Sequence, residues 1–335
     1  MSVDVTPVVT TGVGSWPGTD LADALKIAFA ECPELPYLPE LPARGAHAQL
    51  VGRTTAVLSG LAVDLQPAGW RLTDASGRDH RVARSTLRSD LDLLEELAQD
   101  YEGRFKLSFA GPWTLAALME RPRGDRVLAD AGARRDLGQS LAEGLVDLVA
   151  ELRRRLPRLE LLLQLDEPLL PAVQAGAVPT ASGFSRHRAV DLPELSGAIS
   201  HVVDRLGEAD GVPVGVHCCA AGLPVELLRQ AGVRAVSLDL DQLVPADWDA
   251  LGVGFEQGLG LALGALPTDR ELSADEVARR SLAPLRQLGL DPALVSRHLV
   301  LTASCGLAAA SRAGAIQALR TLRTAAGILT EQLAD

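Results

Sequence analysis

The chain has 335 residues, of which 47% are hydrophobic and 22% charged, so it can bury a large core and is not disordered. Its net charge of −11, with arginines scattered among acidic residues, argues against a nucleic-acid partner. No apolar stretch reaches the roughly 18 residues of a membrane span, and residues 1–18 lack the basic start of a signal peptide. We therefore expect a cytoplasmic protein that acts on small molecules.

Short apolar runs alternate with amphipathic stretches along the chain, a pattern typical of parallel strands joined by crossover helices. Eight strands are predicted, at residues 5–13, 37–41, 106–110, 159–165, 212–218, 235–240, 261–266 and 298–303. Between them, leucines recur at spacings of three and four over 135–155, which predicts a helix. Ser273 and Glu276 form the pattern of a capping box that opens another helix.

Two segments interrupt this alternation. Residues 70–82 hold the turn sequence DASG at 74–77 between two short alternating runs, which predicts a β-hairpin after the second strand. Residues 171–191 are rich in Ala, Gly, Pro and Ser and are predicted to form a long loop that could cover a site.

Eight strands alternating with helices predict an α/β fold, a (β/α)8 TIM barrel formed by residues 1–335 as one catalytic domain. Polar residues follow the predicted strands, as expected for a barrel whose site lies at the carboxyl ends of its strands. A doubly wound open sheet is the alternative, but the glycines of residues 11–17 lack the spacing of a nucleotide-binding turn.

The strongest chemical signal is the sequence HCC at 217–219. Side chains two apart on a strand share a face, so His217 and Cys219 point one way and Cys218 the other. Cys305, after the last predicted strand, is a further candidate ligand. Imidazole and thiolate suit zinc, and catalytic zinc sites keep one position open beside three protein ligands. The sequence therefore predicts a Zn²⁺ site, with packing of small buried residues as the alternative.

Six short motifs in order resemble the C-terminal catalytic barrel of the cobalamin-independent methionine synthases. They are TTGVGSWP at 10–17, GPWTL at 111–115, QLDEP at 164–168, HCC at 217–219, VSLD at 236–239 and SCGL at 304–307. The resemblance implies zinc-dependent transfer of a methyl group from 5-methyltetrahydrofolate, or a related donor, to the thiol of homocysteine, which gives methionine.

The resemblance also implies roles for particular residues. His217, Cys219 and Cys305 would hold the zinc, with Asp239 in the place of the family's fourth ligand, a glutamate. Asp241 follows on the same strand face and could compete with it. Ser15 and Asp166 match residues that bind the amino acid part of homocysteine, and Asp166 is the predicted catalytic residue.

The chain departs from the family in two further ways. Residues 41–47 stand where the family carries an acidic motif, and the chain has the length of one barrel, without the family's N-terminal half. Three alternatives remain open on the sequence: a corrinoid-dependent or other thiol methyltransferase, a uroporphyrinogen decarboxylase-like enzyme, and a noncatalytic barrel with structural zinc. The sequence does not predict an oligomeric state.

Overall fold

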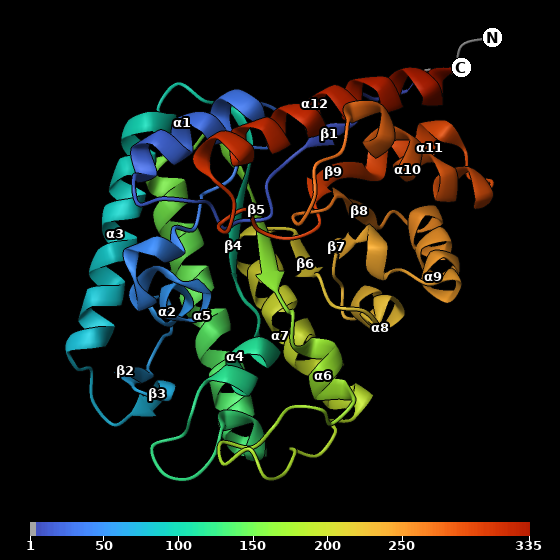
Figure 1. The fold of residues 1–335 in the computed structure, drawn as a ribbon. Coiled ribbons are helices and arrows are strands. Elements are labelled where there is room, and N and C mark those ends of the chain that lie inside the picture. The colour runs from blue at the N-terminus through green and yellow to red at the C-terminus, as the bar shows by residue number, and fades with distance from the viewer. Residues whose placement is uncertain (1–4) are drawn as a thin grey trace.

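The protein, described over residues 5–335 in a computed structural model, is a curled parallel sheet surrounded by helices (Figure 1). The seven strands pair in the order β1-β9-β8-β7-β6-β5-β4, so chain neighbours are mostly sheet neighbours. The strands are β1 (Val9–Thr10), β4 (Gly103–Ala110), β5 (Leu159–Asp166), β6 (Val214–Cys218), β7 (Ala235–Asp239), β8 (Gly260–Leu266) and β9 (Leu299–Ala303). Because all are parallel, their carboxyl ends meet at one end of the sheet.

Helices cover the outside of this sheet (Figure 1). They are α1 (Leu21–Glu31), α2 (Leu50–Thr55), α3 (Arg78–Ala98), α4 (Pro112–Leu118), α5 (Ala131–Arg155), α6 (Leu170–Gln174), α7 (Leu192–Asp210), α8 (Val225–Gln230), α9 (Pro245–Glu256), α10 (Ala274–Gln287), α11 (Pro292–His298) and α12 (Arg312–Ala334). Two sequence predictions are confirmed here: residues 135–155 lie in α5 with their leucine face buried, and Ser273 with Glu276 caps α10.

The predicted second strand forms only isolated bridges. Tyr37 bridges to Lys106 of β4, and Glu40 bridges to Ser15 beyond β1. The backbone of Glu40 donates to the carbonyl of Gly14 at 3.0 Å and accepts from Trp16 at 2.7 Å. The α/β prediction is therefore confirmed as a curled parallel sheet of seven strands among the described residues. Residues 36–40, which include most of the predicted strand 37–41, carry too few successive ladder bonds to count as an eighth strand, so the (β/α)8 barrel itself is not confirmed.

The hairpin prediction is right in kind and wrong in position. The antiparallel pair is β2 (Ala62–Gln66) with β3 (Gly69–Thr73), and its connection is Pro67-Ala68. Gly69 there takes a φ of +134°, a conformation that L side chains rarely adopt. The stronger turn sequence at 74–77 instead ends β3 and leads into α3, since a turn-rich segment also serves to start a helix.

The predicted loop at 171–191 begins with the short helix α6 and then runs to Asp191, whose carboxylate caps α7. Of the described helices, none combines the length and the apolar character that crossing a bilayer requires.

Candidate metal centre

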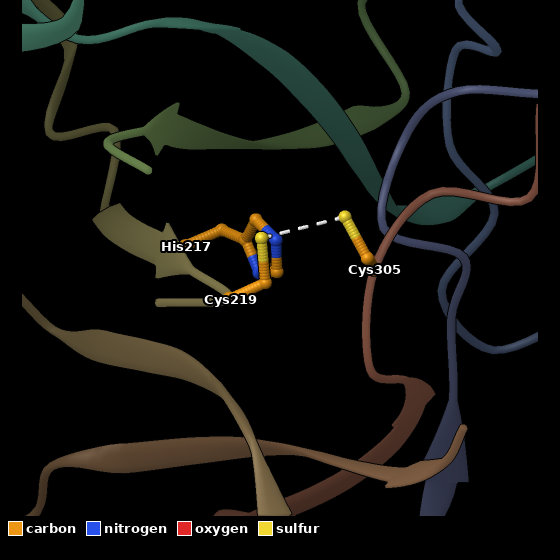
Figure 2. Close-up of side chains that lie close together, drawn as sticks. All are labelled: His217, Cys219 and Cys305. Carbon is orange, nitrogen blue, oxygen red and sulfur yellow. Dashed lines mark hydrogen bonds between the residues drawn. The ribbon is translucent and has the colours of Figure 1, made fainter. Parts of the chain in front are cut away.

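Three side chains with metal-binding atoms converge at the carboxyl ends of the strands. His217 is the fourth residue of β6, Cys219 follows that strand directly, and Cys305 follows β9. Their ligand atoms all lie within 4.8 Å of one another. The Sγ atoms of Cys219 and Cys305 are 3.5 Å apart (Figure 2).

Side chains alternate between the two faces of β6, and this decides which of its residues point toward the cluster. His217 points into the site with a 3% exposed side chain, whereas Cys218 is fully buried in the surrounding hydrophobic core. The thiol of Cys218 donates to the carbonyl of Ala220 at 3.6 Å. Cys218 is thus a packed thiol on the opposite side of β6 from His217.

The two nitrogens of His217 have different surroundings. Nδ1 lies 2.9 Å from Oγ of Ser237 on the neighbouring strand β7, while Nε2 is buried and has no hydrogen-bond partner among residues 5–335. Metal-binding histidines commonly use one ring nitrogen for the metal and donate the other N–H to a neighbouring group. Nε2 of His217 is therefore free to bind a metal ion, while Ser237 orients the ring through Nδ1.

The spacing of the two cysteines also fits a shared metal ion. A disulfide would bring the sulfur atoms to about 2.05 Å, and all four cysteines are free thiols. Two thiolates on one tetrahedral zinc, with Zn–S bonds of about 2.3 Å, lie roughly 3.8 Å apart. Cys219 first, and then His217, lowers the pKa of Cys305, while the same contact raises the pKa of Cys219, so the pair favours one thiolate beside one thiol. The group could bind a metal ion.

Asp239, the candidate fourth ligand, ends β7 but is not one of the three clustered residues. One of its carboxylate oxygens, Oδ1, accepts from the backbone N–H of Asp241 at 3.0 Å and caps the following turn. Burial first, and also the negative charges of Asp241 and Cys305, raise the pKa of Asp239. Asp241, the competing candidate, instead forms ion pairs with Arg270 and Arg280.

Asp166 lies at the end of β5, buried beside His217, whose positive form would lower its pKa. Burial outweighs this effect and raises the pKa of Asp166. Its Oδ1 accepts from Nε2 of Gln164 at 2.7 Å, and Oε1 of Gln164 accepts from Nζ of Lys106 at 2.6 Å. Burial lowers the pKa of Lys106 to about 8. A hydrogen-bonded row from Lys106 through Gln164 therefore fixes the Asp166 carboxylate.

Ser15 packs directly against the loop that carries Cys305. A Cβ atom on Gly306 would lie 1.9 Å from Oγ of Ser15, so a larger residue there would have to displace the Ser15 hydroxyl. The carbonyl of Ser15 also accepts from the backbone N–H of Leu307 at 2.9 Å. These contacts tie the N-terminal motif to the loop of the late cysteine and place Ser15 beside the cluster.

Two buried charged residues near Asp166 were not singled out in the sequence. Glu40 is 7% exposed and Arg53 is 2% exposed, and each interacts electrostatically with Asp166. Burial raises the pKa of Glu40 to about 7, against the attraction of Arg53. The signal was present: Glu40 is the one charged residue in the predicted strand 37–41.

Glu167, next to Asp166 in the QLDEP motif, has a structural partner instead. Its carboxylate accepts from the backbone N–H groups of Trp113 and Thr114 and from the Thr114 hydroxyl, at 2.7–2.9 Å. A Cβ on Gly111 would lie 2.3 Å from this carboxylate. Glu167 therefore holds the start of α4, so packing explains the glutamate of QLDEP and its partner residues in GPWTL.

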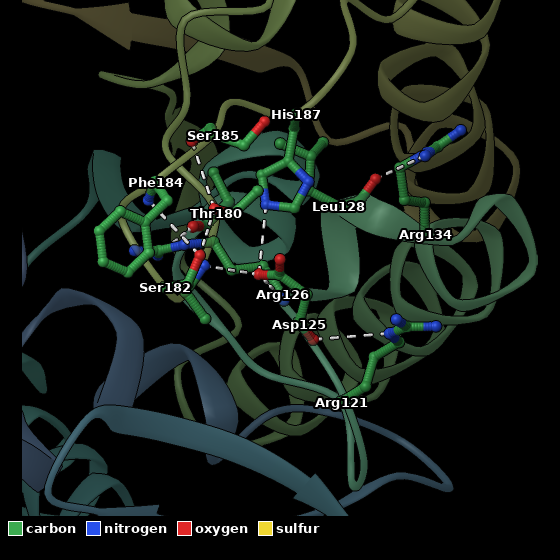
Figure 3. A network of polar contacts seen from close by, with 12 residues as sticks. Arg121, Asp125, Arg126, Leu128, Arg134, Thr180, Ser182, Phe184, Ser185 and His187 are labelled. Carbon is green, nitrogen blue, oxygen red and sulfur yellow. Dashed lines mark hydrogen bonds and ion pairs between the residues drawn. The ribbon is translucent and has the colours of Figure 1, made fainter.

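The loops beyond α4 and α6 are joined by a polar network centred on Asp125 (Figure 3). Its Oδ1 accepts from the backbone N–H of Ala181 at 2.8 Å and lies 3.4 Å from Nε2 of His187. This carboxylate also accepts from its neighbour, the Arg126 N–H, at 2.7 Å. The predicted long loop is thus fastened to the loop after α4, while Phe184 at its tip stays 97% exposed.

Comparison with known proteins supports the resemblance through the fold. No family model and no curated protein matches the sequence. Among solved structures, a B12-independent methionine synthase from Shewanella sp. W3-18-1, in complex with selenomethionine, matches with a TM-score of 0.65. The match covers 98% of this chain and 99% of that one, at 16% identity. A beta-galactosidase from Marinomonas ef1 matches with a TM-score of 0.48 and 12% identity, over 97% of this chain and 60% of that one.

Proposed function

We propose that this protein is a zinc-dependent S-methyltransferase that transfers a methyl group from 5-methyltetrahydrofolate, or a related donor, to homocysteine and forms methionine. One observation carries the proposal. The unpartnered Nε2 of His217 meets two thiols 3.5 Å apart, at the carboxyl ends of strands in a fold shared with a methionine synthase. Residues 1–335 would form one catalytic barrel, with residues 36–40 as its eighth position, and the cytoplasmic location stays a prediction.

His217, Cys219 and Cys305 would hold the zinc in this proposal. Bound zinc would ionise the acceptor thiol at neutral pH and so supply a nucleophile for the methyl carbon. Asp239 would serve as the exchangeable fourth ligand. When a substrate thiol displaces this carboxylate from the metal, it still has the backbone N–H of Asp241 as a hydrogen-bond partner. Ser237 would keep His217 in the orientation that presents Nε2.

Asp166 would bind the ammonium group of the acceptor amino acid, with Ser15 beside it at the Cys305 loop. Burial of an ionised carboxylate is costly, and this cost outweighs the attraction of the neighbouring cations and raises the pKa of Asp166. An ammonium group at this position would offset the cost with a charge-assisted hydrogen bond. Gln164 restricts the carboxylate to one orientation, so the substrate would be oriented by a preformed group.

Metal analysis and X-ray absorption on the purified protein test the proposal. We expect about one zinc per chain, and homocysteine should replace an oxygen ligand by sulfur while a proton is released. Methyl transfer is then assayed with methyl folate and, separately, with methylcobalamin. Activity with methylcobalamin alone would move the protein to the corrinoid-dependent class, and no zinc would favour the decarboxylase-like alternative.

Two further results would refine or reject the substrate. If another thiol changes the ligands of the zinc but homocysteine does not, the methyltransferase assignment stands and methionine is rejected as the product. If no thiol changes the ligands of the zinc, a structural role for the zinc is favoured. Asp166→Asn should keep its zinc and raise the KM for homocysteine at least tenfold, while a thiol without an amino group is affected little. Equal effects on both thiols would remove this role from Asp166.

A further inference from the structure

The opposite end of the sheet contains a cavity that the proposed reaction does not use. A cavity of about 330 Å³ lies inside the curled sheet at the amino ends of the strands. Barrel interiors are normally filled by layers of bulky branched side chains. Here the inward positions include Gly215, Ala235, Gly260 and Ala262, all of them partly exposed, so that the interior stays open.

The mouth of this cavity is basic. Arg104, Arg234 and Arg297 line it and are exposed, and the partly buried His298 lies beside them. Among the described lining residues there is no aspartate or glutamate, although the whole chain carries a net charge of −11. Three exposed arginines around the cavity of an otherwise acidic protein attract an anionic group.

The inner wall of the cavity is polar but has its hydrogen bonds satisfied. Lys106 donates to the carbonyls of Gly12 and Val13 and to Gln164, and Gln164 donates to Val13 and Asp166. Ser237, also in the lining, is engaged with His217. Because these groups already have partners, an apolar chain end in contact with this wall would leave no donor unpaired.

We propose that this cavity binds a medium-chain carboxylate, with its apolar chain inside the sheet and its carboxylate at the arginine rim. The volume is at the lower end of the range for small-molecule pockets. The lining run from Arg234, just before β7, to Ser237 of that strand spans about 10 Å at 3.3 Å per residue, so the chain must be short. The proposal rests on the cavity alone and is independent of metal binding and methyl transfer.

Isothermal titration of the purified protein with decanoate, decan-1-ol and acetate tests the proposal. Decanoate should bind, and decan-1-ol and acetate should bind at least about tenfold more weakly, because each lacks one of the two features recognised. Ala262→Leu should abolish decanoate binding by filling the cavity. The double variant Arg234→Gln, Arg297→Gln should weaken it about tenfold or more, since charge-assisted hydrogen bonds are lost.

Arg135→Gln is the matched control, because this side chain is 69% exposed on α5 and does not line the cavity. It should bind decanoate as the unmodified protein does. The surface arginine variants keep the test decisive should Ala262→Leu fail to fold. Equal affinity for decan-1-ol, unchanged affinity in the double arginine variant, or absence of decanoate binding would each overturn the proposal.

Discussion

At the scale of single residues, the neighbours Cys218 and Cys219 give a direct test of the candidate metal centre. His217→Ala, Cys219→Ala and Cys305→Ala should each lose most of the bound zinc, because two N or S ligands are too few for tight binding. Cys218→Ser should retain it, since its thiol contacts the Ala220 carbonyl rather than the cluster. Metal content after gel filtration distinguishes the four variants. Retention by Cys219→Ala together with loss by Cys218→Ser would reverse the assignment.

A second prediction at this scale concerns Glu40. Burial raises its pKa from 4.5 to about 7 in the folded protein. The folded state therefore keeps a proton that the unfolded chain releases, and stability present below pH 4.5 is lost as the pH rises through 7. The loss amounts to at most about 3 kcal/mol. Glu40→Gln should remove this part of the pH dependence, measured by denaturant unfolding between pH 5 and 8.

Glu34→Gln is the control for this measurement, because Glu34 is exposed and lies close by in the sequence. It should leave the pH dependence of the unfolding free energy as it is. If the Glu40→Gln profile coincides with that of the unmodified protein, the Glu40 carboxyl does not hold its proton in the folded state.

At the scale of the elements, two glycines inside long helices have opposite surroundings. A Cβ on Gly144 of α5 would lie 1.5 Å from the carbonyl oxygen of Val57. In the part of the chain that the structure describes, a Cβ on Gly327 of α12 would meet no atom within 4 Å outside its own stretch of helix. Gly144→Ala should lower the free energy of unfolding by about 1–3 kcal/mol through overpacking. Gly327→Ala should raise it by about 0.5–1 kcal/mol through helix propensity. Urea unfolding measures both, and a stabilised Gly144→Ala would contradict this packing.

Elements were predictable from the sequence where one periodicity and one pattern of burial agree. The leucine spacing of α5 and the strand of residues 159–165 show this, since each buries a continuous face. The second strand was not predictable in this way, because residues 36–40 reach their neighbours through isolated bridges set by the curl of the sheet. The hairpin was predicted at the wrong position because Pro67-Ala68, which connects the two strands, is a weaker turn sequence than residues 74–77.

The candidate site shows the same division. The convergence of His217, Cys219 and Cys305 follows from parallel strands that end at one edge, so spacing and residue type were enough to predict it. Whether Asp239 reaches the cluster depends on a side-chain rotation and on its turn, which no periodicity describes. Glu40 and Arg53 meet Asp166 only through tertiary packing, which local patterns do not describe.

At the scale of the whole molecule, the candidate metal centre brings together distant parts of the chain. Cys219 and Cys305 are separated by 86 residues, yet their side chains touch across the end of the sheet. A metal ion held by both would bind the folded state and not the unfolded one, and would stabilise it by about 2.7 kcal/mol at a free concentration a hundredfold above its Kd. Removing the ion should therefore loosen the contact between β6 and the loop after β9.

The last prediction is a change in melting temperature on chelation. A strong zinc chelator should lower the Tm of the unmodified protein and of Cys218→Ser by several degrees, on the order expected for a 2–3 kcal/mol loss. Cys305→Ser should start at a lower Tm and respond little, because its cluster is already incomplete. Differential scanning calorimetry gives all three shifts. A full response in Cys305→Ser would mean that the chelator acts at another site, and the stabilising ion would then lie outside this cluster.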